Sequence, residues 1–113
     1  MDSGVAMVNG VSLKIFTSEF VKHDGKLLYE WLLEYAQKQG MPGGSAFRAL
    51  AGFGRHGMRE EHFFELASNV PVEVLFIGSD DQITQFLIAL GREKVNCFYV
   101  KAPVEYGLLD SNN

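Results

Sequence analysis

Hydrophobic and polar residues alternate along the first segment that predicts regular structure, residues 11–16. Val11, Leu13 and Ile15 fall on one face and alternate with Ser12, Lys14 and the apolar Phe16 on the other. Such alternation is typical of a β-strand with one face against a core. Three further segments predict strands: residues 45–52, 70–77 and 96–104. The strand at 70–77 is apolar on both faces apart from Pro71 and Glu73, so both of its faces need cover.

Two other segments have the apolar spacing of amphipathic helices. The stripe of the first comprises Leu27, Leu28, Trp31, Leu32, Tyr35 and Ala36, and that of the second comprises Ile83, Phe86, Leu87 and Leu90. We expect Asp24 to cap the start of the first helix and Gly40 to end it. Ser79 and Gln82 form a capping-box pattern before the second helix, which we expect to end at Gly91.

The order strand, helix, strand, strand, helix, strand predicts an α+β fold, the ferredoxin-like βαββαβ sandwich, with two helices on one face of a four-stranded antiparallel sheet. The helices cover one face, and the apolar residues expected on the other are Phe16, Leu75, Ile77 and Tyr99. A large exposed apolar face is unusual on a monomer, so we expect an oligomer. The alternative is that the C-terminal tail folds back over this face.

The bulk composition narrows the class of protein. A length of 113 residues suits one domain, which we place at residues 11–104 between flexible tails at 1–10 and 105–113. A net charge of −4 argues against nucleic-acid binding. Cys97 is the only cysteine, which excludes an intrachain disulfide. No leader or membrane-spanning pattern is visible, so we expect a cytoplasmic protein without membrane insertion.

The candidate chemistry lies where the second predicted strand ends. Gly52 and Gly54 lack a Cβ atom, so the backbone N–H groups near them can form a nest for an anion, and Arg55 adds a forked donor suited to phosphate or carboxylate. The segment that follows, residues 53–69, is longer than an ordinary connection. A strand-ending bend with a solvated Arg55 is the alternative interpretation.

The run Gly52-Phe53-Gly54-Arg55 resembles the run at the end of the second strand in PII signal-transduction proteins. With Phe47-Arg48 before it and Asn69-Val70-Pro71-Val72 after the long segment, the chain is still more similar to the PII-like group known as domain-of-unknown-function family 190. The resemblance covers about residues 11–102.

The resemblance implies a homotrimer whose sheets face inward, with a ligand cleft between neighbouring subunits. It implies an adenine nucleotide (AMP, ADP or ATP) as the small anionic ligand and no covalent cofactor. The ligand-binding residues that it suggests are Arg48, Gly52, Phe53, Gly54, Arg55 and His56. The regulated partner would be a membrane transporter, a channel or an enzyme, contacted through the 53–69 loop.

The chain also departs from the PII pattern. The connection at residues 91–95 is short and has one glycine, where PII proteins have a second glycine-rich basic loop. Residues 55–69 contain no tyrosine, so the tyrosine-modification switch of some PII proteins cannot operate there. We therefore expect a differently built phosphate site and signalling by ligand-dependent ordering of the loop.

Other classes of function have weaker support in the sequence. A metal-binding trimer like the CutA proteins, which share the fold, would draw its ligands from His23, His56, His62, Glu60, Glu61 and Glu65, but their spacing matches no known three-ligand set. The sequence shows no nucleophile together with a general base, so it does not indicate an enzyme. Cys97 is interpreted as a small core hydrophobe. Trp31 and Tyr35 are assigned to the core. Phe63 and Phe64 suit either subunit packing or a partner, so a pure protein-interaction module also stays open.

Overall fold

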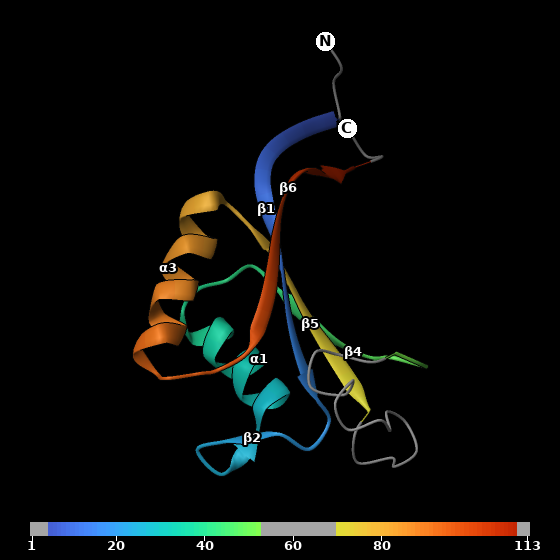
Figure 1. Cartoon of the computed structure of the whole chain (residues 1–113). Coiled ribbons are helices and arrows are strands. Elements are labelled where there is room, and N and C mark those ends of the chain that lie inside the picture. Colours follow the sequence, from blue (N-terminus) through green and yellow to red (C-terminus); the bar gives the residue numbers. More distant parts are fainter. Residues whose placement is uncertain (1–4, 53–69, 111–113) are drawn as a thin grey trace.

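A computed structural model of the chain describes residues 5–52 and 70–110. Figure 1 shows its elements. In chain order they are β1 (Val5–Ser18), β2 (Lys22–His23), β3 (Lys26–Leu27), α1 (Leu28–Lys38), β4 (Gly44–Arg48), β5 (Pro71–Gly78), α3 (Asp80–Arg92) and β6 (Phe98–Leu109). Apart from the small β2–β3 hairpin, this is the predicted βαββαβ order.

The four long strands form one antiparallel sheet in the order β4-β5-β1-β6. Both helices pack on the same side of this sheet, seen edge-on in Figure 1. The ferredoxin-like prediction is thus confirmed, with β1 and β5 in the centre and β4 and β6 at the edges.

The core lies between the sheet and the two helices. Register pairs Leu13 with Phe76 and Ile15 with Val74, so these four side chains share the helix-covered face, where each is at most 1% exposed. The helices contribute Leu28, Leu32, Ala36, Ile83, Phe86 and Leu90 to the same cluster. The stripes read from the sequence therefore meet the strands in a single core. Trp31 and Tyr35 pack against it, as predicted.

The helix ends show which capping predictions were right. Ser79 accepts a hydrogen bond from the Gln82 backbone N–H, and the Gln82 side chain accepts one from the Ser79 N–H, which confirms the capping box. Asp24 does not cap α1. The N-cap is Leu27, which has no side-chain cap, and Asp24 instead lies in the turn of the β2–β3 hairpin at φ +53.

Both helices end in a Schellman motif. In α1, Gly40 adopts φ +84 and the Met41 N–H donates to the Ala36 carbonyl. In α3, Lys94 adopts φ +61 and the Val95 N–H donates to the Leu90 carbonyl. The expected end of α1 near Gly40 is confirmed, but α3 continues past Gly91 to Arg92 and Glu93 is its C-cap. A non-glycine residue therefore occupies the left-handed position of the second motif.

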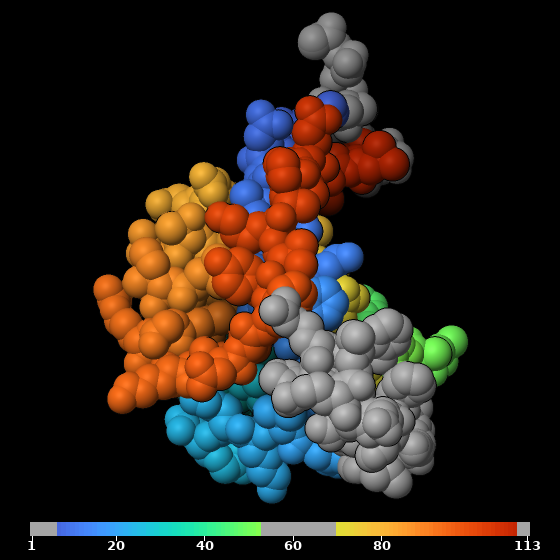
Figure 2. Space-filling model, viewed as in Figure 1, coloured from blue at the N-terminus to red at the C-terminus, as the bar shows by residue number. Residues whose placement is uncertain are grey.

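The outer parts of β1 and β6 differ most from expectation. Residues 5–10 and 105–109, expected in flexible tails, pair with each other and extend the ladder past Gly78, where β5 ends. Figures 1 and 2 show this two-stranded arm projecting beyond the helices. The Tyr106 ring lies over Gly10, where a Cβ atom would be 2.5 Å from the ring. Since residues 105–109 continue β6 and stay paired with β1, these residues do not fold back over the sheet.

No helix of the described residues covers the opposite face of the sheet (Figure 1). The described residues that register and alternation place there include Phe16, Phe47, Leu75, Ile77, Phe98 and Val100. Phe47 and Phe98 are each about half exposed, and the rings of Phe16 and Phe98 lie 5.6 Å apart. We call this the open face. Tyr99 was wrongly assigned to it, because Tyr99 pairs with Ile15 and so belongs to the helix side.

Candidate functional site

The candidate ligand segment begins at Arg48, the last residue of β4. The strand was expected to continue to Gly52, but it ends four residues earlier, and the Ala49 N–H makes one further bond to the Pro71 carbonyl. Arg48 pairs with Val72 across the sheet, so it lies on the helix side of the edge strand. Its side chain is 63% exposed. The guanidinium is therefore available at the end of the sheet.

Arg48 already has an anionic partner. Its Nη2 donates to Glu19 Oε1 at 3.1 Å, and the Glu19 side chain is only 19% exposed. Glu19 is held in place by its own backbone, because its N–H donates to the Val70 carbonyl. The ion pair thus connects the end of β4 to the segment after β1 and neutralises the Arg48 charge locally. An incoming anion at Arg48 would have to share or displace Glu19.

Gly52 requires glycine for its conformation. Its φ is +157°, which L residues rarely adopt, and a Cβ atom placed there would meet no atom of the described residues within 4 Å. The constraint is therefore the backbone angle rather than crowding. Gly52 is the last residue described before the long segment.

The other candidate ligand residues, Phe53, Gly54, Arg55 and His56, lie outside the described residues. So do His62, its neighbouring glutamates and the pair Phe63 and Phe64. The structure therefore brings Arg48 and Gly52 into one short exposed segment and adds Glu19, which the sequence analysis did not single out. No local pattern marks Glu19, because its role depends on a contact 29 positions along the chain.

A shallow pocket of about 330 Å³ lies near the start of β4. Its lining includes Met41, Gly44 and Phe76, and none of the residues that line it is charged. An anion would find no cationic side chain there. The pocket is therefore a poor alternative to the segment that starts at Arg48.

Cys97 behaves as the sequence suggested. It is partly buried against the core, and burial raises the pKa of its thiol above the ordinary value. A raised pKa favours the neutral thiol, which is a poor nucleophile.

The structure also assembles a cluster that was missed. His23 and Asp24 on the hairpin meet Glu93 at the end of α3. His23 is a candidate metal ligand in the sequence, but with other partners, and Asp24-Gly25 between His23 and Lys26 is a favoured two-residue turn that marks the hairpin. Glu93 is 69 positions from Asp24, and no local pattern could place it there.

Solved structures with a similar fold are PII-like proteins. A putative PII-like signaling protein from Thermus thermophilus aligns with a TM-score of 0.59 and 16% identity, covering 91% of this chain and 92% of that one. CPII from Thiomonas intermedia, a nitrogen regulatory PII-like protein bound to ADP, AMP and bicarbonate, aligns with a TM-score of 0.61 and 14% identity, covering 91% and 92%. The ferredoxin-like sandwich described above is thus the PII-like fold.

The family follows from the sequence comparisons. The model of DUF190, "Uncharacterized ACR, COG1993", matches residues 10–106. A UPF0166 protein from Aquifex aeolicus is 42% identical over 76 residues, which are 66% of this chain and 72% of that protein. A second UPF0166 protein, from Methanocaldococcus jannaschii, is 27% identical over 81 residues, 72% of this chain and 75% of that protein. The chain belongs to the DUF190 family, and the family resemblance read from the sequence is confirmed.

No helix in residues 5–52 and 70–110 has the length and apolar character needed to cross a membrane.

Proposed function

We propose that the chain is a cytoplasmic, non-catalytic regulatory protein that forms a homotrimer and binds an adenine nucleotide in the clefts between subunits. Ligand binding would change the 53–69 loop and so alter contact with a partner protein, such as a transporter, a channel or an enzyme. The observation that carries the proposal is the open face of the sheet.

The open face is apolar and central to the molecule. Phe16 and Ile77 are 36% and 38% exposed although they lie in the central strands β1 and β5, and Val100 on the edge strand β6 is 41% exposed. At about 25 cal/mol per Å² of apolar surface, covering these side chains offers a substantial driving force. The face also carries the Lys14–Glu73 ion pair, with 3.7 Å between its charged atoms. A charge pair that is satisfied within its own chain can enter an interface without leaving an unpaired charge.

The arm gives a second reason to expect other copies. Among the described residues, β1 pairs with β6 alone from Gly10 toward the N-terminus, and an isolated two-stranded ribbon is marginal in water. Met7, Leu108 and Leu109 on this arm are 61%, 77% and 85% exposed. Apolar side chains on a projecting ribbon are best explained by contact with a neighbouring subunit.

The ligand class is inferred from the fold and from the segment after β4. CPII, a protein of the same fold, has been solved with ADP, AMP and bicarbonate. In this chain the segment offers the Arg48 guanidinium and a glycine-dependent backbone at Gly52. Because Glu19 neutralises Arg48, we infer that Gly54, Arg55 and His56 supply most of the attraction for phosphate. Arg48 would then have a secondary role.

Isothermal titration calorimetry with ATP, ADP and AMP tests the ligand. We expect saturable binding of at least one nucleotide, weakened at least about tenfold in Arg55→Ala. Gly52→Val should weaken binding as well, because valine resists the backbone angle found there. Glu19→Gln should leave binding unchanged or strengthen it, since it removes the anion that competes at Arg48.

The matched control is Lys38→Ala, which removes a cation from the last turn of α1. Its affinity for each nucleotide should equal that of the wild type. Absence of heat with all three nucleotides would overturn the proposed ligand. Binding that is equally strong in Arg55→Ala, Gly52→Val and the control would place the nucleotide at another site.

A further inference from the structure

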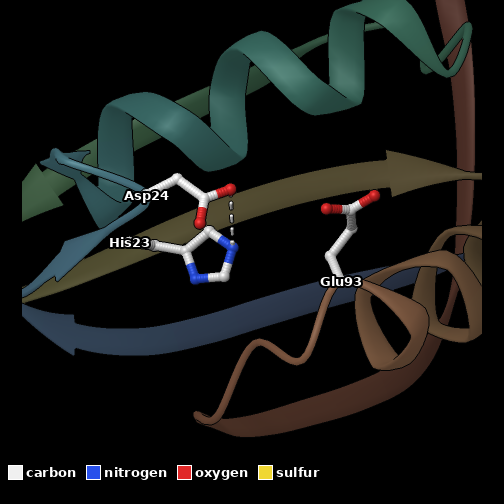
Figure 3. A group of neighbouring side chains, drawn as sticks. All are labelled: His23, Asp24 and Glu93. Atoms are coloured by element: carbon white, nitrogen blue, oxygen red, sulfur yellow. Dashed lines mark ion pairs between the residues drawn. The ribbon is translucent and has the colours of Figure 1, made fainter.

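Three potential metal ligands from two distant parts of the chain meet at one end of the helix layer. His23 and Asp24 belong to the β2–β3 hairpin, and Glu93 follows the last turn of α3. One ligand atom from each lies within 4.8 Å of the other two. Figure 3 shows the Glu93 carboxylate directed toward His23 and Asp24. The donor set is one imidazole and two carboxylates.

The hairpin holds His23 and Asp24 through its backbone. His23 pairs with Lys26 across the two-residue turn, in which Asp24 and Gly25 adopt φ +53 and +81. The Leu28 N–H donates to the Val21 carbonyl and closes the base of the hairpin against the start of α1. These two ligands are therefore fixed relative to α1.

Glu93 is held by the end of α3. It is the C-cap residue, and its N–H donates to the Ala89 carbonyl. The left-handed Lys94 then turns the chain away from the helix. The backbone of Glu93 is thus fixed, while its exposed carboxylate can adjust by the small amount that a metal would need.

The His23 ring has a defined orientation and an unsatisfied atom. Its ring packs edge-on against Trp31 with centroids 4.4 Å apart, and its side chain is 16% exposed. The Nε2 atom is shielded from solvent and has no hydrogen-bond partner among the described residues. The nearby carboxylate oxygen, Asp24 Oδ2, is 3.7 Å away, beyond hydrogen-bond distance. A buried nitrogen in this position needs a partner between itself and the carboxylates.

Neighbouring lysine and arginine side chains do not supply the partner for the two carboxylates. Lys26 is hydrogen-bonded to Glu34 with 2.6 Å between Nζ and Oε1, which draws its charge toward α1. Within residues 5–52 and 70–110, neither Asp24 nor Glu93 forms an ion pair with a lysine or an arginine. Two carboxylates and one imidazole nitrogen thus converge without a side-chain cation to compensate them.

We propose that His23, Asp24 and Glu93 bind a divalent transition metal, with Zn²⁺ the best match. Zn²⁺ accepts imidazole nitrogen together with carboxylate oxygen, whereas Ca²⁺ and Mg²⁺ prefer all-oxygen sets. Three protein ligands leave a fourth tetrahedral position for water or an external ligand. A bound metal would connect the hairpin to the end of α3. This site is separate from the segment after β4, so the proposed metal binding does not depend on nucleotide binding.

Metal titration of chelator-stripped protein tests the site. Zn²⁺ affinity is measured by competition with a chromophoric chelator, and Co²⁺ is used as a spectroscopic substitute. We expect one ion per chain. Glu93→Gln keeps the size of the side chain and should weaken binding at least about tenfold. His23→Phe keeps a ring against Trp31 and should weaken binding about a hundredfold.

Two controls separate this cluster from other donors. Glu105→Gln removes an exposed carboxylate on β6 that lies outside the cluster and should bind like the wild type. The double variant His56→Ala/His62→Ala removes the histidines of the long segment and should keep the Zn²⁺ affinity of the wild type, whatever its effect on nucleotide binding. Far-ultraviolet circular dichroism of each metal-free variant checks that the fold is retained.

Either of two results would overturn the proposal. One is the absence of Zn²⁺ and Co²⁺ binding by the wild type. The other is metal binding that persists unchanged in both Glu93→Gln and His23→Phe, which would place the ion elsewhere.

Discussion

The same alternation of side chains produces the two faces of the sheet, but the side chains on the two faces differ in how much they are exposed. On the helix side, Leu13, Val74 and Phe76 are at most 1% exposed. One residue along, Ile77 on the open face stays 38% exposed, although it lies in the same strand. The described residues therefore cover one face of the sheet with helices and leave the other face partly exposed. The covered face determines the fold, and the exposure of the open face supports our proposal that it determines assembly.

Truncation of the covered face should have the largest effect. Phe76 packs edge-on against Phe86, with ring centroids 5.1 Å apart, and its ring lies over Gly44. Phe76→Ala leaves a cavity between sheet and helices, so we expect a loss of about 3–5 kcal/mol in the free energy of unfolding. Chemical denaturation monitored by circular dichroism measures it. A loss below about 1 kcal/mol would contradict the core assignment.

The neighbouring residue provides the matched change on the open face. Ile77→Asp places a charge where we propose that subunits meet, and it leaves the helix side intact. We expect the association free energy to weaken by about 2–3 kcal/mol per subunit, while the isolated chain keeps its secondary structure. Sedimentation velocity and circular dichroism measure the two quantities. If the variant unfolds like Phe76→Ala without any prior change in assembly, the two faces do not have separate roles.

The smallest effect should come from the helix ends, which lie on the covered side. Lys94 occupies a left-handed position that glycine adopts without strain, so Lys94→Gly should stabilise the fold by roughly 0.5–1 kcal/mol. The matched change Gly40→Ala creates the same strain in α1 and should destabilise by a similar amount. Thermal melting of both variants measures the pair. If both variants are stabilised, or both are destabilised, the left-handed backbone geometry is not the cause of the stability changes.

The covered face could be predicted because its signals are local. Alternation in residues 11–16 placed Val11, Leu13 and Ile15 on one face, and Ser79 with Gln82 marked the start of α3. Tyr99 was assigned to the wrong face because the phase of an edge strand is set by its partner, here Ile15, and not by its own composition.

The arm and the group formed by His23, Asp24 and Glu93 could not be predicted, because each depends on contacts between distant segments. Residues 5–10 have no strand signal of their own and become a strand by pairing with residues 104–109. Glu93 reaches His23 only through the packing of α3 beside the hairpin. The hairpin itself had a local signal in Asp24-Gly25, so the misplaced cap of α1 was avoidable.

The proposed trimer requires that other copies of the chain cover the open face. Sedimentation equilibrium of the wild-type protein at micromolar concentration tests this directly. We predict a species of three times the mass of one chain, which Ile77→Asp converts to single chains. A wild-type protein that sediments as one folded chain across this concentration range would contradict the trimer and the intersubunit ligand cleft together.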